Sequence, residues 1–155
     1  MVQEPENQRV KVTEMNDYKE YFQKASYLQY PLMLSAVGYF YKPFFTGFDS
    51  MWNDYNYGLI FMGLAFSFAT LQDTTKTQNE FSKKIYKNPV WSRRFLIYIM
   101  VLVIVFIVGG LYALFASETE IINSLSYGLL SVGVGLLGVL KTAGEMAQYH
   151  SESIN

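Results

Sequence analysis

Residues 95–116 read FLIYIMVLVIVFIVGGLYALFA and contain no side chain more polar than tyrosine. As a helix this stretch is apolar on every side, so a soluble protein would have to bury all of it. A transmembrane helix needs about 20 predominantly apolar residues to cross a hydrocarbon core of about 30 Å. Residues 95–116 meet that requirement and predict a membrane-spanning helix.

Three further uncharged windows, residues 25–41, 55–72 and 121–140, separate the clusters of charge in the rest of the chain. Only 16% of the 155 residues are charged, against about 25% in soluble proteins. The last window is as apolar as a span requires, whereas the first two contain glutamine, serine or threonine and are weaker candidates. Together the windows predict an all-α polytopic membrane protein, a four-transmembrane-helix bundle with spans at about 25–45, 55–72, 93–116 and 121–141.

The distribution of lysine and arginine predicts the orientation, because cytoplasmic connections retain basic residues. The connection between the second and third spans is predicted to form a cytoplasmic arm over residues 73–92. This arm and the start of the third span carry six basic residues: Lys76, Lys83, Lys84, Lys87, Arg93 and Arg94. The other two connections carry only acidic charges: Asp49, Asp54, Glu118 and Glu120. We therefore expect both termini in the cytoplasm.

The N-terminal part of the chain is polar and lacks a signal peptide. Residues 1–12 have no periodicity and are predicted to be mobile. From Thr13 onwards, Met15, Tyr18, Phe22 and Ala25 recur at helical spacing, which predicts an amphipathic interfacial helix over residues 13–24. The alternative is a helix packed on the protein's own cytoplasmic surface. The remainder up to residue 150 is predicted to be one membrane domain, followed by a tail over 151–155.

Prolines and caps predict where several helices begin and end. Pro31 and Pro43 each predict a bend or a boundary in the first span, because proline lacks a backbone donor and clashes with the preceding turn. Residues 64–88 contain neither glycine nor proline, so we expect the second helix to continue past the membrane. Asn88 and Pro89 are suited to the N-cap and first position of the third helix.

A stripe of small residues runs along the fourth span at alternating steps of four and three. It consists of Ser124, Gly128, Ser131, Gly135, Gly138 and Thr142, and Glu145 continues it. Small residues on one stripe allow a second helix to approach closely where the hydrophobic effect gives no help. Gly63 and Ser67, followed by Thr70, offer a matching stripe in the second span. The alternatives are packing within one chain, an interface between protomers, and a weakly selective pore lining.

Two charges near the membrane are candidate functional groups. Lys42 lies near the outer end of the first span, where its stem can extend to the surface and Asp49 or Asp54 can receive its ammonium. Glu145 lies at the inner end of the fourth span. In an oligomer, the Glu145 carboxylates of several protomers can form a ring at the mouth of a pore. Alternatively, Glu145 pairs with Lys141 one turn earlier.

The remaining composition excludes much chemistry. The chain has no cysteine, a single histidine at position 150 and a net charge of −1. We find no paired carboxylates in any span, no phosphate-binding glycine loop and no metal-ligand spacing. The sequence therefore predicts a protein that is not an enzyme, binds no nucleic acid and needs no cofactor.

The expected function is that of a non-enzymatic assembly or accessory subunit that acts through tight helix packing. Its expected partners are the lipid bilayer, including anionic headgroups at the basic arm, and either further copies of itself or a larger membrane complex. The alternative is a small oligomeric ion channel or pore. Small size and the lack of a targeting signal favour the bacterial inner membrane.

Overall fold

The computed structural model describes residues 18–72, 88–115 and 118–152, and no strand occurs among them. Its principal helices are α2 (Gln29–Thr46), α3 (Met51–Ala69), α5 (Pro89–Phe115) and α6 (Glu120–Glu152). A helical segment over residues 18–26 precedes α2 and is separated from it by a two-residue turn. The chain is therefore all-helical where it is described, as the sequence predicts.

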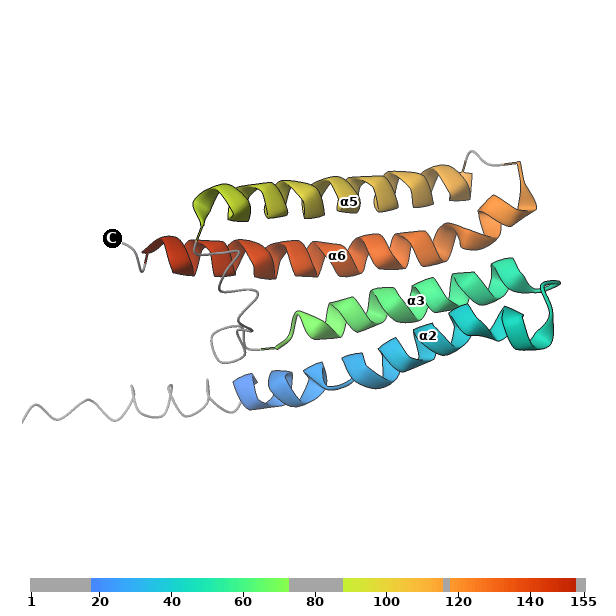
Figure 1. Cartoon of the computed structure of the whole chain (residues 1–155), viewed down its shortest axis with the longest axis horizontal. Helices are drawn as coiled ribbons and strands as arrows, with labels where there is room; N and C mark the ends of the chain where they lie inside the picture. The colour runs from blue at the N-terminus through green and yellow to red at the C-terminus, as the bar shows by residue number, and fades with distance from the viewer. Residues whose placement is uncertain (1–17, 73–87, 116–117, 153–155) are drawn as a thin grey trace, which may run out of the picture.

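The four helices lie side by side in one row, in the order α2, α3, α6, α5 (Figure 1). α3 packs between α2 and α6, and α6 packs between α3 and α5. This arrangement differs from the predicted bundle, in which four helices close around a shared core. Because the row does not close, α2 and α5 are edge helices with one principal neighbour each.

Both prolines of α2 lie within about one turn of a helix end, in agreement with the sequence. Pro31 falls in the first turn, where a missing backbone donor costs nothing. Pro43 precedes the end of the helix, and its carbonyl accepts the N–H of Gly47 at 3.1 Å. Gly47 has a φ of 96°, which glycine adopts without strain, and it turns the chain towards α3.

α3 ends at Ala69, so the prediction that the second helix continues a few turns past the membrane is wrong at residues 70–72. The Thr70 hydroxyl donates to the Ser67 carbonyl at 2.7 Å. The N–H groups of Leu71 and Gln72 then donate to carbonyls three residues back, as in a tightened last turn. Threonine bonds its own backbone in this way and is a weak helix former. Residues 73–87, which include most of the predicted arm, lie outside the described residues.

The cap predicted for α5 is confirmed, because the Val90 N–H donates to Asn88 Oδ1 at 3.1 Å. α6 is longer than its predicted span and continues to Glu152, so His150 and the first residues of the predicted tail are helical. The extension packs on the start of α5: Ala143, Met146 and Ala147 belong to one apolar cluster with Phe95 and Ile99. Burial on α5 accounts for the extra turns.

The helical segment over residues 18–26 runs nearly in line with α2 (Figure 1). Tyr18, Tyr21 and Phe22 are all more than half exposed. Glu20 and Lys24 form an exposed ion pair at 2.8 Å, and the hydrogen bond from Lys24 lowers the pKa of the Glu20 carboxyl. The first part of the predicted interfacial helix, residues 13–17, lies outside the described residues.

Two of the described helices are long and apolar enough to cross a membrane. They are Val90–Phe115, with a mean hydropathy of 2.8 over its apolar window, and Ile121–Gln148, with 1.5. α2 and α3 are not among the helices that meet this criterion. The two apolar helices thus correspond to the third and fourth predicted spans.

Two glycines of the α2 region respond differently to the same change. Gly47→Ala should lower the free energy of unfolding by about 1–2 kcal/mol, because a φ of 96° is unfavourable for any residue with a Cβ. Gly38→Ala should raise it by about 0.5–1 kcal/mol, because Gly38 lies inside the helix with open space around it. Denaturant titration in detergent micelles measures both. Equal effects would contradict the backbone geometry at Gly47.

Candidate functional site

The stripe of small residues on α6 lies against α3 in the same chain. A Cβ added at Gly135 would overlap the carbonyl oxygen of Gly63, and one added at Gly63 would overlap the carbonyl group of Ser131. The two helices therefore meet backbone to backbone at this crossing. Such an approach is possible only where side chains are absent or very small.

The contact extends along the stripe in both directions from the crossing. A Cβ at Gly128 would lie 2.6 Å from the Cβ of Leu59, and one at Gly138 would lie 2.8 Å from Cγ2 of Thr70. Ser67 turns its hydroxyl back to its own helix and donates to the Gly63 carbonyl at 3.0 Å. Ser124 and Thr142, at the two ends of the stripe, are half-buried.

Two hydrogen bonds join α3 and α6 across this contact. Ser131 Oγ donates to the carbonyl of Ile60 at 3.2 Å. The backbone N–H of Gly128 donates to Asn56 Oδ1 at 2.8 Å. A side chain that reaches an interior backbone group of another helix is a recognised cause of bending, and the first turns of α6 bend away from the rest of the helix (Figure 1).

Asn56 was not singled out as a site residue from the sequence, although a signal was present. Asn56 and Ile60 precede Gly63, Ser67 and Thr70 at the same alternating steps of four and three, so the stripe of α3 begins one heptad earlier than predicted. Asn56 is 8% exposed. A buried amide on a stripe of small residues indicates a polar contact with the helix that covers the stripe.

α6 also contacts α5 through glycine, on a side that the predicted stripe does not include. A Cβ at Gly133 would lie 2.7 Å from Cγ1 of Ile107, and one at Gly110 would lie 2.7 Å from Cγ of Leu130. Val132, in the same region of α6, is 1% exposed. Glycine therefore permits close packing of α6 on both of its neighbours.

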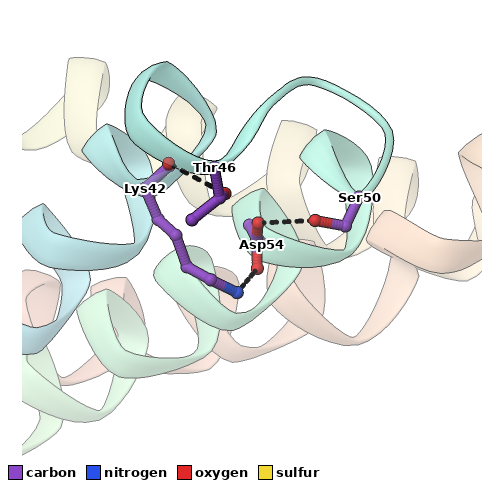
Figure 2. A network of polar contacts seen from close by, with 4 residues as sticks. All are labelled: Lys42, Thr46, Ser50 and Asp54. Atoms are coloured by element: carbon purple, nitrogen blue, oxygen red, sulfur yellow. Dashed lines mark hydrogen bonds and ion pairs between the residues drawn. The ribbon is translucent and has the colours of Figure 1, made fainter.

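A half-buried ion pair joins α2 to α3 near the turn between them (Figure 2). Lys42 Nζ lies 2.6 Å from Asp54 Oδ1, and Ser50 Oγ donates to Oδ2 at 3.0 Å. The Asp54 side chain is 2% exposed, whereas that of Lys42 is 44% exposed. The ammonium also lies 5.7 Å from the centre of the Tyr39 ring. Both carboxylate oxygens of Asp54 are thus occupied by groups of this protein.

The structure selects Asp54 from the two acids that the sequence offered to Lys42, and Asp49 lies exposed in the turn. Asp54 lies in the first turn of α3, where the helix dipole favours a negative charge. A buried carboxylate requires a partner of opposite charge, since removing it from water alone is costly. The geometry therefore gives Lys42 a structural role in holding the hairpin closed.

The other predicted charges are at the surface. Lys141 Nζ lies 3.7 Å from Glu145 Oε1, and the two side chains are 78% and 58% exposed, so the pair contributes little to stability. Arg93 and Arg94 are exposed near the start of α5, where the Arg94 guanidinium lies 6.0 Å from the Trp91 ring. The remaining residues of the basic arm lie outside the described residues: Lys76, Lys83, Lys84 and Lys87.

The described polar groups of this region bind one another. In the part of the chain that the structure describes, no group of three or more histidine, cysteine or acidic residues is placed to hold a metal ion. No buried side-chain nitrogen or oxygen lacks a hydrogen-bond partner there. The arrangement is therefore suited to joining helices.

The crossing of α3 and α6 predicts a large difference between two glycines of α6. Gly135→Leu should lower the free energy of unfolding by about 3 kcal/mol or more, because the new side chain must displace the backbone of α3. Gly144→Leu should change it by less than about 1 kcal/mol, since nothing lies within 4 Å of a Cβ there. Denaturant titration in micelles measures both. Equal stability of the two variants would contradict the contact.

Asn56→Ala should lower the free energy of unfolding by about 1 kcal/mol, because it removes the acceptor of the Gly128 N–H. Asn53→Ala is the matched control, since Asn53 lies in the same helix and is exposed. We expect it to change stability by less than about 0.5 kcal/mol. The same titration tests both variants, and an Asn53 effect as large as that of Asn56 would contradict a specific role for the hydrogen bond.

Comparisons of this chain with protein-family models, with curated proteins and with solved structures give no match.

Proposed function

We propose that this protein is a non-enzymatic integral membrane subunit with four transmembrane helices and both termini in the cytoplasm. Its work is to assemble within the membrane, with further copies of itself or with a larger complex. The observation that carries the proposal is the exposure of its most apolar helices. Only 17% of the apolar window of α5 and 28% of that of α6 are buried within the protein.

A soluble protein places its most apolar helix in the core, where most of its residues are buried. α5 does the opposite along its outer side, where Ile104 is 53% exposed, Val108 58% and Phe115 81%. Exposing such a surface to water raises the free energy of the folded protein, whereas lipid chains solvate it. Lipid is therefore the solvent that suits this row of helices.

α2 and α3 are included as spans because they extend the same row. The 18 residues of α2 have a length of about 27 Å, close to the thickness of a hydrocarbon core. Its outer side carries apolar residues such as Leu34, which is 74% exposed, and Phe45, which is 86% exposed. Three polar side chains that lower the hydropathy of this hairpin are paired within the protein: Lys42 with Asp54, and Asn56 with α6.

The charges of the described residues favour the proposed orientation. The α2–α3 and α5–α6 connections lie at the same end of the row (Figure 1). They carry Asp49 and Glu118, whereas Arg93, Arg94 and Lys141 belong to the parts of α5 and α6 nearer the opposite end. Lys42 is the exception at the acidic end, and it is paired with Asp54. Basic residues are retained in the cytoplasm. A bacterial inner membrane, with anionic lipid at the basic end, fits this pattern.

Assembly would use the edges of the row, because α3 covers the stripe of small residues on α6. α2 has its principal contacts with α3, and α5 with α6, so the far side of each edge helix is available to another protein. The alternative function, an oligomeric pore lined by the stripe, is disfavoured by the same contact. Conductance of small ions through liposomes that contain the purified protein would favour that alternative.

Assembly at the edges can be tested with single cysteines, since the chain contains none. Leu34→Cys on α2 and Val101→Cys on α5 lie on exposed sides of the edge helices. We expect mild oxidation of membranes to produce disulfide-linked dimers with at least one of them, detected by non-reducing electrophoresis. If the neighbour at an edge is a different protein, a bifunctional thiol-to-amine crosslinker should link that protein to the same variants.

Ala36→Cys is the matched control, because Ala36 is 1% exposed and should form no linked product. Monomer mass for both edge variants with both reagents, at native levels of expression, would contradict assembly through the edges.

A further inference from the structure

We propose that the α2–α3 hairpin is a conditional membrane insert, which crosses the bilayer only when Lys42 and Asp54 neutralise each other. The α5–α6 hairpin, by contrast, crosses the bilayer because its helices are sufficiently apolar. This inference rests on the proposed four-span function. It adds that the pairing of Lys42 with Asp54 decides whether α2 and α3 cross the membrane.

The first argument is the contrast between the two hairpins. α5 and α6 both meet the length and hydropathy criterion for a membrane span, and α2 and α3 do not. Lys42 of α2 and Asp54 of α3 lie beside the turn that must cross the bilayer, whereas the basic residues of α5 and α6 lie nearer the opposite end of the row. Charged groups are the most costly residues to transfer into a bilayer. The insertion of this hairpin therefore depends on whether those two charges neutralise each other.

The second argument is the geometry of the pair. Lys42 and Asp54 come from opposite helices, on either side of the turn, and their charged atoms lie 2.6 Å apart. Ser50, which precedes α3, occupies the other carboxylate oxygen. The charges are therefore neutralised only when α2 and α3 have formed a closed hairpin (Figure 2). Either charge alone would be unfavourable: Asp54 because it is 2% exposed, and Lys42 because basic residues resist transfer to the outer side.

The third argument is the dependence of the hairpin on α6. Asn56 is buried and its side-chain oxygen accepts the backbone N–H of Gly128. Ser131 of α6 donates in turn to the carbonyl of Ile60. Lipid offers no donor in place of the Gly128 N–H, so α6 must be in place before the Asn56 side-chain oxygen accepts this bond. Under this proposal the α2–α3 hairpin lies across the membrane when its charges are paired and its contacts with α6 are made, and on the cytoplasmic side when they are not.

The test uses two reporter cysteines in a chain that otherwise has none. Asn53→Cys lies in the first turn of α3 and Asn123→Cys in the first turn of α6, and both positions are exposed. Intact cells are treated with a membrane-impermeant maleimide, and labelling after detergent permeabilisation gives the total. We expect both parent reporters to be labelled from outside.

Asp54→Asn should lower the outside labelling of the Asn53→Cys reporter by about threefold or more, and leave that of the Asn123→Cys reporter unchanged. The double variant Lys42→Met with Asp54→Asn should restore labelling, because no charge remains to be neutralised. Asp49→Asn is the matched control: it removes the same charge from the same connection at an exposed position, and labelling should stay at the parent level.

The outcomes separate the two proposals. If the parent Asn53→Cys reporter is not labelled from outside while the Asn123→Cys reporter is, the four-span function is overturned, and this inference with it. If the parent is labelled and Asp54→Asn is labelled equally, only the conditional insertion is overturned. Equal loss in Asp54→Asn and in the double variant would likewise overturn it, because charge pairing would not be the cause.

Discussion

The contact between the backbones of α3 and α6 at Gly63 and Gly135 is the constraint on which the rest of the arrangement depends. Helices in a membrane gain nothing from the hydrophobic effect by packing together, so their association relies on dispersion contacts and short polar interactions. Both weaken rapidly with distance. The absence of a Cβ at Gly63 and Gly135 allows the approach that places Ser131 within hydrogen-bonding distance of Ile60 and Gly128 within reach of Asn56.

The row follows from the way α3 divides its surface between two neighbours. Asp54 and Gly58 lie one turn apart and face α2, where a Cβ at Gly58 would lie 2.9 Å from the Phe40 ring. Asn56 and Gly63 lie on the other side of the helix and face α6. Two residues correspond to about 200° around a helix, so Asp54 and Asn56 point to nearly opposite sides. A helix with neighbours on opposite sides lies in the middle of a flat layer. Such a layer does not close into a four-helix bundle around one core.

The sequence was sufficient to predict the helices and the stripe of α6, because these depend on local patterns of apolar and small residues. It also limited the partner of Lys42 to two acids. The row, the role of Asn56 and the glycine contacts of α5 could not be predicted in the same way. A repeat shows which side of a helix carries small residues, but it does not show which neighbouring helix covers that side. The packing of the whole chain determines that neighbour. The long extension of α6 likewise depends on a tertiary contact, because α5 covers the added turns. The early end of α3 at Ala69 has a local cause, since the Thr70 hydroxyl bonds the Ser67 carbonyl and threonine is a weak helix former.

The polar groups divide into two kinds, and the division explains what each helix contributes. Several serine and threonine hydroxyls bond their own helix, as Ser35 does with the Pro31 carbonyl and Ser126 with that of Asn123, and such bonds do not determine which helix packs alongside. The hydrogen bonds and ion pair described between helices all involve α3: the Asp54 carboxylate, the Asn56 amide and the Ile60 carbonyl. α5 is the most apolar helix, and its described contacts with α6 are made by apolar side chains and by the glycines Gly110 and Gly133. Since polar interactions have strict distance and direction, the less apolar α3 fixes the order of the row, while under the proposed function α5 would supply much of the affinity for the bilayer.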